Sequence, residues 1–252
     1  MNAFFLKYLI FRAIGSACIG GASNNGCRIL MYHSLSADVD NDTHGIYKIN
    51  KDSFKDQVLS LVNNSAHNFI PLCDWSINSK GLVVTFDDGF LDTLLIAAPI
   101  LSKYNIPFSV FVSPGLVKLN DKRYLDKGAL LELSKVNDCT IGAHGYSHCR
   151  LSECDNKKLN HELMGSKQWL EDTLSIPINT MSYPFGSVNS RVRDAAHDAG
   201  YKIAVSSHPG NNFKKEDPLC LNRTDIWSVD NINVFNQKVN GCFDWIRLFS
   251  RN

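Results

Sequence analysis

Apolar runs without polar alternation recur along this chain and predict buried strands. The clearest run is Leu82–Phe86, which holds only apolar and β-branched residues. A strand of this kind is buried on both faces, which is typical of parallel sheets covered by helices. Similar runs predict further strands at 29–33, 108–113, 139–143, 178–183, 201–206 and 219–226, with a short one at 69–72.

Apolar residues at helical spacing fill the segments between these runs. They predict helices at 52–63, 91–101, 127–136, 190–199 and 235–249. Ser152-x-x-Asp155 matches a capping box that opens a long helix ending near Leu174, with charged residues such as Glu162 on its solvent-exposed face. Strands and helices that alternate in this way predict an α/β protein with a parallel sheet and right-handed crossovers.

Two adjacent carboxylates, Asp87 and Asp88, follow the strand 82–86 directly, and Gly89 permits a tight turn after them. Two charges at the mouth of a hydrophobic core repel each other and are costly to bury. We therefore expect a cation beside them, and a metal ion is the natural candidate. On this stretch alone, the alternative that both aspartates cap the following helix is equally open.

Two histidines, His144 and His148, lie four residues apart just after the strand 139–143. With one Asp they form a two-histidine, one-carboxylate set that leaves metal positions open for water and substrate. The first predicted strand ends at His33. Since such residues follow several different strands, a barrel is favoured over an open sheet, which collects ligands chiefly at one switch point.

Composition is ordinary for a single large globular domain of 252 residues. The chain has 26 basic and 25 acidic residues, which gives no case for a nucleic-acid partner. Its 8 cysteines include no CxxC pair, so reduced thiols in a cytosolic compartment are favoured. Cys149, beside His148, is interpreted as a small buried packing residue.

The N-terminal segment, residues 1–27, is predicted to be an extension that precedes a domain at 28–252. Its apolar stretch, 3–22, is interrupted by Lys7 and Arg12, so it fits neither a spanning helix nor a signal peptide well. We expect an amphipathic helix that lies on a membrane surface or on the domain. An uncleaved anchor is the alternative, and small residues near its end leave secretion open.

Three segments taken together resemble motifs one to three of the polysaccharide deacetylases, the NodB-homology group of carbohydrate esterase family four. They are Thr85–Gly89, His144-x-x-x-His148 and Ser182–Gly186, and the resemblance covers roughly 28–223. It implies an incomplete (β/α)7 barrel of the polysaccharide deacetylase type. It also implies a metal-dependent hydrolase that removes N-acetyl groups from an amino-sugar polysaccharide or glycan precursor of a bacterium. From the cysteines and the N-terminal stretch, we expect this protein in the cytoplasm or at the membrane.

The resemblance also implies roles for individual residues. Asp88, His144 and His148 are expected to hold the divalent metal, for which zinc is the first candidate. Asp87 is expected to act as the general base. The segment Tyr183, Pro184 and Phe185 is expected to bind the N-acetylated glycan substrate, with a backbone N–H near Phe185 as a donor to the oxyanion.

This chain departs from the family pattern at two positions. No histidine follows His208, so the usual late general acid is missing; His33 is favoured in its place over His208. Ser182 stands where many members have an arginine that orients the catalytic aspartate. Arg223 is predicted to take over this role by pairing with Asp87.

These departures keep other functions open. A barrel that binds glycan without turnover is one alternative, and a hydrolase of another small amide is a second. A metalloprotease is disfavoured because the sequence holds no His-Glu-x-x-His. Release of acetate from an N-acetylhexosamine glycan distinguishes these functions.

Overall fold

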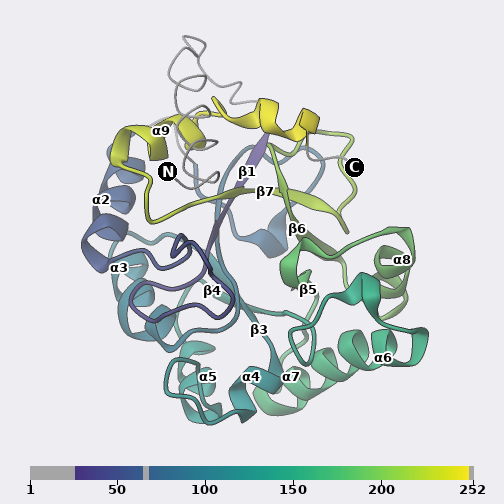
Figure 1. Ribbon diagram of the computed structural model, residues 1–252. Helices are drawn as coiled ribbons and strands as arrows, with labels where there is room; N and C mark the ends of the chain where they lie inside the picture. The colour runs from purple at the N-terminus through teal and green to yellow at the C-terminus, as the bar shows by residue number, and fades with distance from the viewer. Residues whose placement is uncertain (1–25, 65–67, 250–252) are drawn as a thin grey trace.

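A closed barrel of parallel strands forms the centre of the computed structural model, which describes residues 26–64 and 68–249 (Figure 1). Neighbouring strands pair in chain order, and β1 also pairs with β7, which closes the barrel. This is the predicted (β/α)7 barrel, incomplete in lacking the eighth strand of a (β/α)8 barrel. Its strands are β1 (Cys27–Tyr32), β2 (Gly81–Phe86), β3 (Phe108–Val112), β4 (Cys139–Ala143), β5 (Thr180–Ser182), β6 (Ile203–Pro209) and β7 (Leu221–Asp225).

Helices surround the barrel on its outer side (Figure 1). The α-helices are α2 (Lys51–Val62), α3 (Ala98–Ser102), α4 (Pro114–Lys118), α5 (Lys127–Leu133), α6 (Asn156–Asn160), α7 (Ser166–Leu174), α8 (Ser190–Asp198) and α9 (Ile232–Val239). Two π-helical turns, η2 (Thr93–Ala97) and η4 (His161–Gly165), lead into α3 and α7. The 3-10 turns are η1 (Leu72–Asp74), η3 (Leu151–Glu153), η5 (Pro184–Gly186) and η6 (Asp244–Phe249).

The strands lack polar alternation because both of their faces are buried. Along β2, Leu82, Val84 and Phe86 belong to the large cluster between the strands and the outer helices. Val83 faces the opposite way, into a second buried cluster that includes Phe111 and side chains from β1, β6 and β7. Since side chains alternate along a strand, the next residues on this inner face of β2 are Thr85 and Asp87.

Three sequence predictions of local structure were wrong in detail. The helix expected at 235–249 ends at Val239, because Gly241 has a φ of 81° that a continuous helix cannot accommodate. The strand expected at 69–72 is reduced to a single bridge at Phe69. Asp155, not Ser152, caps the long helix: its side chain accepts a hydrogen bond from Lys158 N at 2.7 Å.

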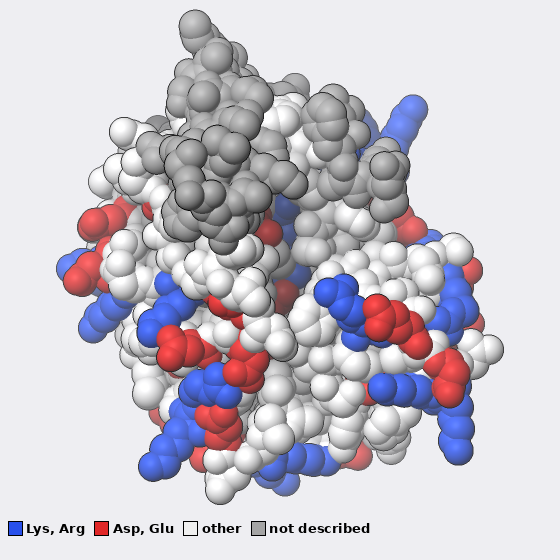
Figure 2. Space-filling view, viewed as in Figure 1, with Lys and Arg blue, Asp and Glu red and all other residues white. Residues whose placement is uncertain are grey.

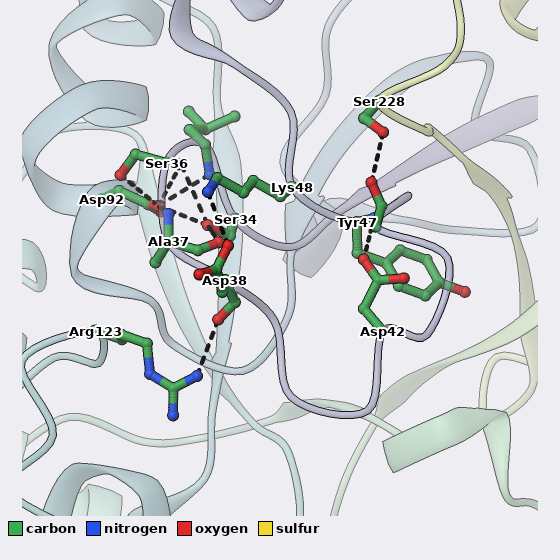
Figure 3. A network of polar contacts seen from close by, with 12 residues as sticks. Ser34, Ser36, Ala37, Asp38, Asp42, Tyr47, Lys48, Asp92, Arg123 and Ser228 are labelled. Atoms are coloured by element: carbon green, nitrogen blue, oxygen red, sulfur yellow. Dashed lines mark hydrogen bonds and ion pairs between the residues drawn. The ribbon is translucent and has the colours of Figure 1, made fainter.

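The segment 34–48, which we call the 34–48 loop, follows β1 and is anchored by one carboxylate, Asp92 (Figure 3). Asp92 Oδ2 accepts hydrogen bonds from Ser34 Oγ at 2.8 Å and from the backbone N–H groups of Leu35 and Ser36 at 3.0 and 2.9 Å. Because Asp92 is only 5% exposed, these donors replace water around a buried charge. The anchor fixes the chain directly after His33.

The predicted N-terminal extension, 1–27, lies outside the described residues except for its last two positions, and the amphipathic helix expected at 3–22 lies outside them entirely. Within 26–64 and 68–249, no helix has both the length and the apolar character needed to cross a membrane. On the face seen in Figure 2, basic and acidic side chains are interspersed.

Replacing Asp92 with Ala should lower the free energy of unfolding by about 3 kcal/mol, because buried donors of the 34–48 loop lose a charged acceptor. Urea titration of the variant and the wild type measures this. Asp198→Ala is the matched control: its side chain is 82% exposed, so we expect a change within about 0.5 kcal/mol. Equal effects of the two substitutions would contradict the anchoring role.

Candidate active site

Three side chains converge at the carboxyl ends of β2 and β4. Asp88 Oδ1 lies 3.2 Å from His144 Nε2 and 3.0 Å from His148 Nε2. One donor atom from each residue lies within 4.8 Å of the others. Asp88 and His144 are buried, and the His148 side chain is 21% exposed. The structure therefore brings together the three residues that the sequence predicted to be metal ligands.

Strained backbone turns bring these side chains together. Asp88 has a φ of 69° and His148 a φ of 56°, both in the left-handed region that costs a non-glycine residue roughly 1 kcal/mol or more. Gly89, with a φ of 73°, continues the turn after Asp88. The turn at Asp88 breaks the strand geometry, so Asp87 and Asp88 carry their carboxylates to different partners.

His144 is oriented by the backbone of β5. Its Nδ1 lies 2.9 Å from Ser182 O. A carbonyl oxygen only accepts hydrogen bonds, so we assign the proton to Nδ1, which leaves the Nε2 lone pair facing Asp88. A hydrogen bond from the second ring nitrogen is the usual support of a metal-binding histidine.

The donor set fits a divalent metal ion. Asp88 Oδ1 is buried and accepts no hydrogen bond of normal geometry, although both imidazole nitrogens lie close to it. A bare nitrogen lone pair facing a carboxylate oxygen is repulsive unless a cation lies between them. One aspartate carboxylate and two imidazoles are ligands that zinc and other divalent transition metals accept.

Asp87 forms a buried ion pair with Arg223 of β7. Asp87 Oδ1 accepts from Arg223 Nη1 at 2.7 Å, and Oδ2 accepts from Nη2 at 2.6 Å. Arg223 Nε donates to Ser206 O at 2.7 Å. Burial would raise the pKa of Asp87, but the Arg223 guanidinium outweighs this effect and holds the pKa below its ordinary value. The predicted pairing of these two residues is present in the structure.

Ser182 joins the ion pair to the histidine cluster. Its hydroxyl accepts from Arg223 Nη2 at 2.8 Å and donates to Asp87 Oδ2 at 3.2 Å, while its carbonyl faces His144 Nδ1. The sequence showed only that Ser182 lacks the charge of an arginine. In the structure, the guanidinium beside Asp87 is that of Arg223 from β7, and the Ser182 hydroxyl is hydrogen-bonded to both side chains.

A cavity of about 250 Å³ opens onto these residues. Asp87, Asp88, His144, His148 and Arg223 contribute to its inner wall. Residues 39–42 of the 34–48 loop and Tyr47 line another part of the wall, and Arg150 and Phe185 lie on the wall as well.

His33 also lines this cavity, as the sequence predicted from its place at the end of β1. Its ring centroid is 4.3 Å from that of Tyr47, and its Nδ1 is buried without a hydrogen-bond partner in the described part of the chain. Asp225, at the end of β7, has one buried side-chain oxygen without a hydrogen-bond partner in the described part of the chain, and burial raises the pKa of this carboxyl group. His208, by contrast, is not among the residues that line the cavity, and its Nδ1 lies 3.1 Å from Ser206 Oγ.

The three residues predicted to bind substrate, Tyr183, Pro184 and Phe185, do not all line the cavity. Tyr183 lines the cavity, but its hydroxyl is turned away and donates to Leu219 O at 2.8 Å. Pro184 is buried and does not belong to the cavity wall. Phe185 is 42% exposed, and its ring centroid lies 4.7 Å from that of His148 and 4.9 Å from the Arg150 guanidinium.

Glu162 of η4 is a site residue that sequence reasoning misplaced. It was assigned to a solvent-exposed face but is only 1% exposed. Its Oε2 accepts from the backbone N–H groups of Tyr146 and Ser147, both at 2.8 Å. Glu162, which is not part of this loop, therefore holds the backbone between the two histidines in place. Nothing in the local pattern separates it from the charged residues around it, because burial depends on the packing of η4 against this loop.

The described residues thus form a seven-stranded parallel α/β barrel, and a carboxylate–histidine cluster that could hold a metal ion lies at the carboxyl ends of its strands. The model of the polysaccharide deacetylase family matches residues 76–204 of the 252. The chain belongs to this family. Asp87, Asp88 and both histidines lie inside the matched region, whereas His33 and Arg223 lie outside it.

Individual proteins agree with this assignment. YxkH of Bacillus subtilis (strain 168) is 24% identical over 205 residues, which cover 79% of this chain and 70% of that protein. The peptidoglycan-N-acetylglucosamine deacetylase of Bacillus cereus is 27% identical over 167 residues, covering 65% and 72%. The structure of the Streptococcus pyogenes deacetylase PplD in complex with acetate shares the fold, with a TM-score of 0.74 at 24% identity over 84% of this chain and 97% of that one.

Replacing Arg223 with Met should lower the free energy of unfolding at neutral pH by about 3 to 5 kcal/mol, because Asp87 is left buried without its partner. The lowered pKa of Asp87 means that the wild-type pair stabilises the fold above the ordinary carboxyl pKa and loses this effect as pH falls through the folded value. In the variant, burial is no longer opposed by Arg223 and raises the pKa of Asp87. The difference in the free energy of unfolding between the wild type and the variant should therefore decrease as the pH falls.

Urea titrations over a series of pH values measure this dependence. The double variant Asp87→Asn, Arg223→Met serves as the control, since it removes both charges and should lose less stability than Arg223→Met alone at neutral pH. A loss that is the same for the single and double variants would show that the ion pair is not what stabilises this part of the barrel.

Proposed function

We propose that this protein is a metal-dependent hydrolase that removes N-acetyl groups from an amino-sugar polysaccharide or glycan precursor. The observation that carries the proposal is the convergence of Asp88, His144 and His148 beside the ion-paired Asp87 in one cavity. Family membership supports it. The names of two relatives do so as well: the Bacillus cereus peptidoglycan-N-acetylglucosamine deacetylase and the poly-beta-1,6-N-acetyl-D-glucosamine N-deacetylase of Staphylococcus aureus (strain MRSA252), 25% identical over 195 residues.

Asp88, His144 and His148 would hold the divalent ion, and zinc is the expected metal because two imidazoles, one carboxylate and a position open to water are a common ligand set of catalytic zinc. When bound, the ion supplies Lewis acidity, which polarises a carbonyl and acidifies water. Glu162 and the carbonyl of Ser182 hold the histidines in place for it.

Asp87 is the proposed general base. Its lowered pKa keeps it ionised at neutral pH, so it is ready to accept a proton from the attacking water. Both of its oxygens bond to Arg223, yet a carboxylate has about four lone-pair sites and therefore keeps acceptor capacity. The two-pronged contact fixes the direction in which the free lone pairs point.

His33 is the proposed general acid. Hydrolysis of an amide needs a proton on the departing nitrogen, and His33 lies on the cavity wall, apart from the metal ligands. His208 is the less suitable donor, because it does not face the cavity and already contacts Ser206.

The exposed ring of Phe185 is proposed to receive a sugar ring at the cavity mouth, since aromatic faces pack against apolar sugar faces. The competing function, a glycan-binding barrel without turnover, drew its support from the missing late histidine and the missing arginine. Arg223 removes the second part of that support, because a guanidinium charge is present beside Asp87.

The Asp87→Asn variant tests the proposed base. It should keep its bound zinc, measured by elemental analysis, while acetate release from N-acetylglucosamine oligomers falls by a factor of about 10² to 10⁴. In the wild type, removal of the metal with a chelator should abolish acetate release, and added zinc should restore it. Wild-type protein that holds zinc but releases no acetate from any N-acetyl sugar would favour the glycan-binding or other-amide alternative.

The general acid is tested by comparing His33→Gln with His208→Gln. We expect His33→Gln to reduce kcat and kcat/KM by about 10²-fold or more, because the departing nitrogen loses its proton donor. His208→Gln should leave both nearly unchanged. The opposite result would assign the donor to His208, and unchanged activity in both variants would exclude either histidine.

A further inference from the structure

Two cysteines lie side by side in the segment that follows His148. The sulfur atoms of Cys149 and Cys154 are 3.4 Å apart. Of the cysteines in the described residues, this is the pair whose sulfurs are in contact. Cys149 is partly exposed, whereas Cys154 is only 7% exposed. One thiol is therefore accessible to a reagent, and the other is held directly behind it.

The backbone keeps the two sulfurs together. Residues 151–153 form the 3-10 turn η3, which folds the chain back between the two cysteines. Arg191 of α8 donates from Nη2 to Ser152 O at 3.2 Å and to Cys154 O at 2.8 Å. The Ser152 N–H donates to Ser187 Oγ at 3.0 Å. These contacts fix the turn to the neighbouring elements, so the approach of the thiols follows from the fold.

We propose that Cys149 and Cys154 form a modification site that closes to an intramolecular disulfide by exchange with a small organic disulfide. The Cys149 sulfur attacks the reagent, which breaks the reagent's S–S bond and releases one thiol. The Cys154 sulfur then attacks the mixed disulfide on Cys149 and releases the second thiol. The protein dithiol is oxidised, the reagent is reduced to two thiols, and the two protein protons leave with them.

The two sulfurs need only a small movement to form the disulfide. Bonded sulfurs are about 2.05 Å apart, so the pair must approach by roughly 1.4 Å. A change in the side-chain torsion of the partly exposed Cys149 supplies such a movement while η3 stays in place. The bond would tether the chain on both sides of Arg150 and immediately after His148. This inference is independent of the proposed hydrolase function, since it concerns only the two thiols.

The test uses the purified, full-length protein incubated with oxidised glutathione for several hours, since buried thiols exchange slowly. Free thiols are then alkylated, and the denatured protein is digested with trypsin without reductant. Cleavage after Arg150 places Cys149 in peptide 136–150 and Cys154 in peptide 151–157. We expect these peptides to stay joined, at a mass lower than their sum by two hydrogen atoms, and to separate on reduction.

Two variants make the result specific. Cys139 shares the peptide 136–150, so Cys139→Ser should still give the joined peptides. Cys154→Ser should instead trap glutathione on Cys149, because the resolving thiol is gone. If wild-type protein gives both peptides with alkylated cysteines, or with glutathione on Cys149 and no joined product, the proposal is overturned. Loss of the joined peptides in Cys139→Ser would overturn it equally.

Discussion

The ion pair between Asp87 and Arg223 is the interaction on which the site depends. Both groups lie inside the barrel, where removing two charges from water costs several kcal/mol per ion. The fold meets this cost by giving each charge a full set of partners. Two parallel hydrogen bonds join the pair, and Ser206 O and Ser182 Oγ accept the remaining guanidinium protons that face them. The pair thereby ties β2 to β5, β6 and β7.

The same ion pair gives the neighbouring carboxylates of Asp87 and Asp88 different partners. Asp87 continues the inner face of β2 and meets Arg223, whereas the left-handed turn at Asp88 directs that carboxylate to His144 and His148. Backbone strain at Asp88 is therefore part of how the site is built, since an extended residue there would send its side chain elsewhere. Ser182 connects the two groups, with its hydroxyl on the ion pair and its carbonyl on His144.

Sequence reasoning predicted much of this site because its chemistry lies in short segments at strand ends. Parallel strands carry their carboxyl ends to one side, so residues that follow β1, β2 and β4 had to meet. Residues whose burial or orientation depends on packing between separate elements were harder to predict from the sequence. Glu162 was placed on the wrong side of its helix, because a π-helical turn and the packing of the 144–148 loop decide its burial. Similarly, the hydroxyl of Tyr183 turns to Leu219 and away from the cavity.

The sequence by itself determined the (β/α)7 barrel, the positions of its strands, the family and the grouping of Asp88 with His144 and His148. These follow from local patterns: apolar runs, helical spacing and motifs of a few residues. Only the tertiary structure showed that Arg223 does pair with Asp87, that His33 rather than His208 lines the cavity, and that Cys149 lies against Cys154. Each of these depends on distances between segments that no local pattern encodes, because the closure of the barrel and the packing of its loops set them.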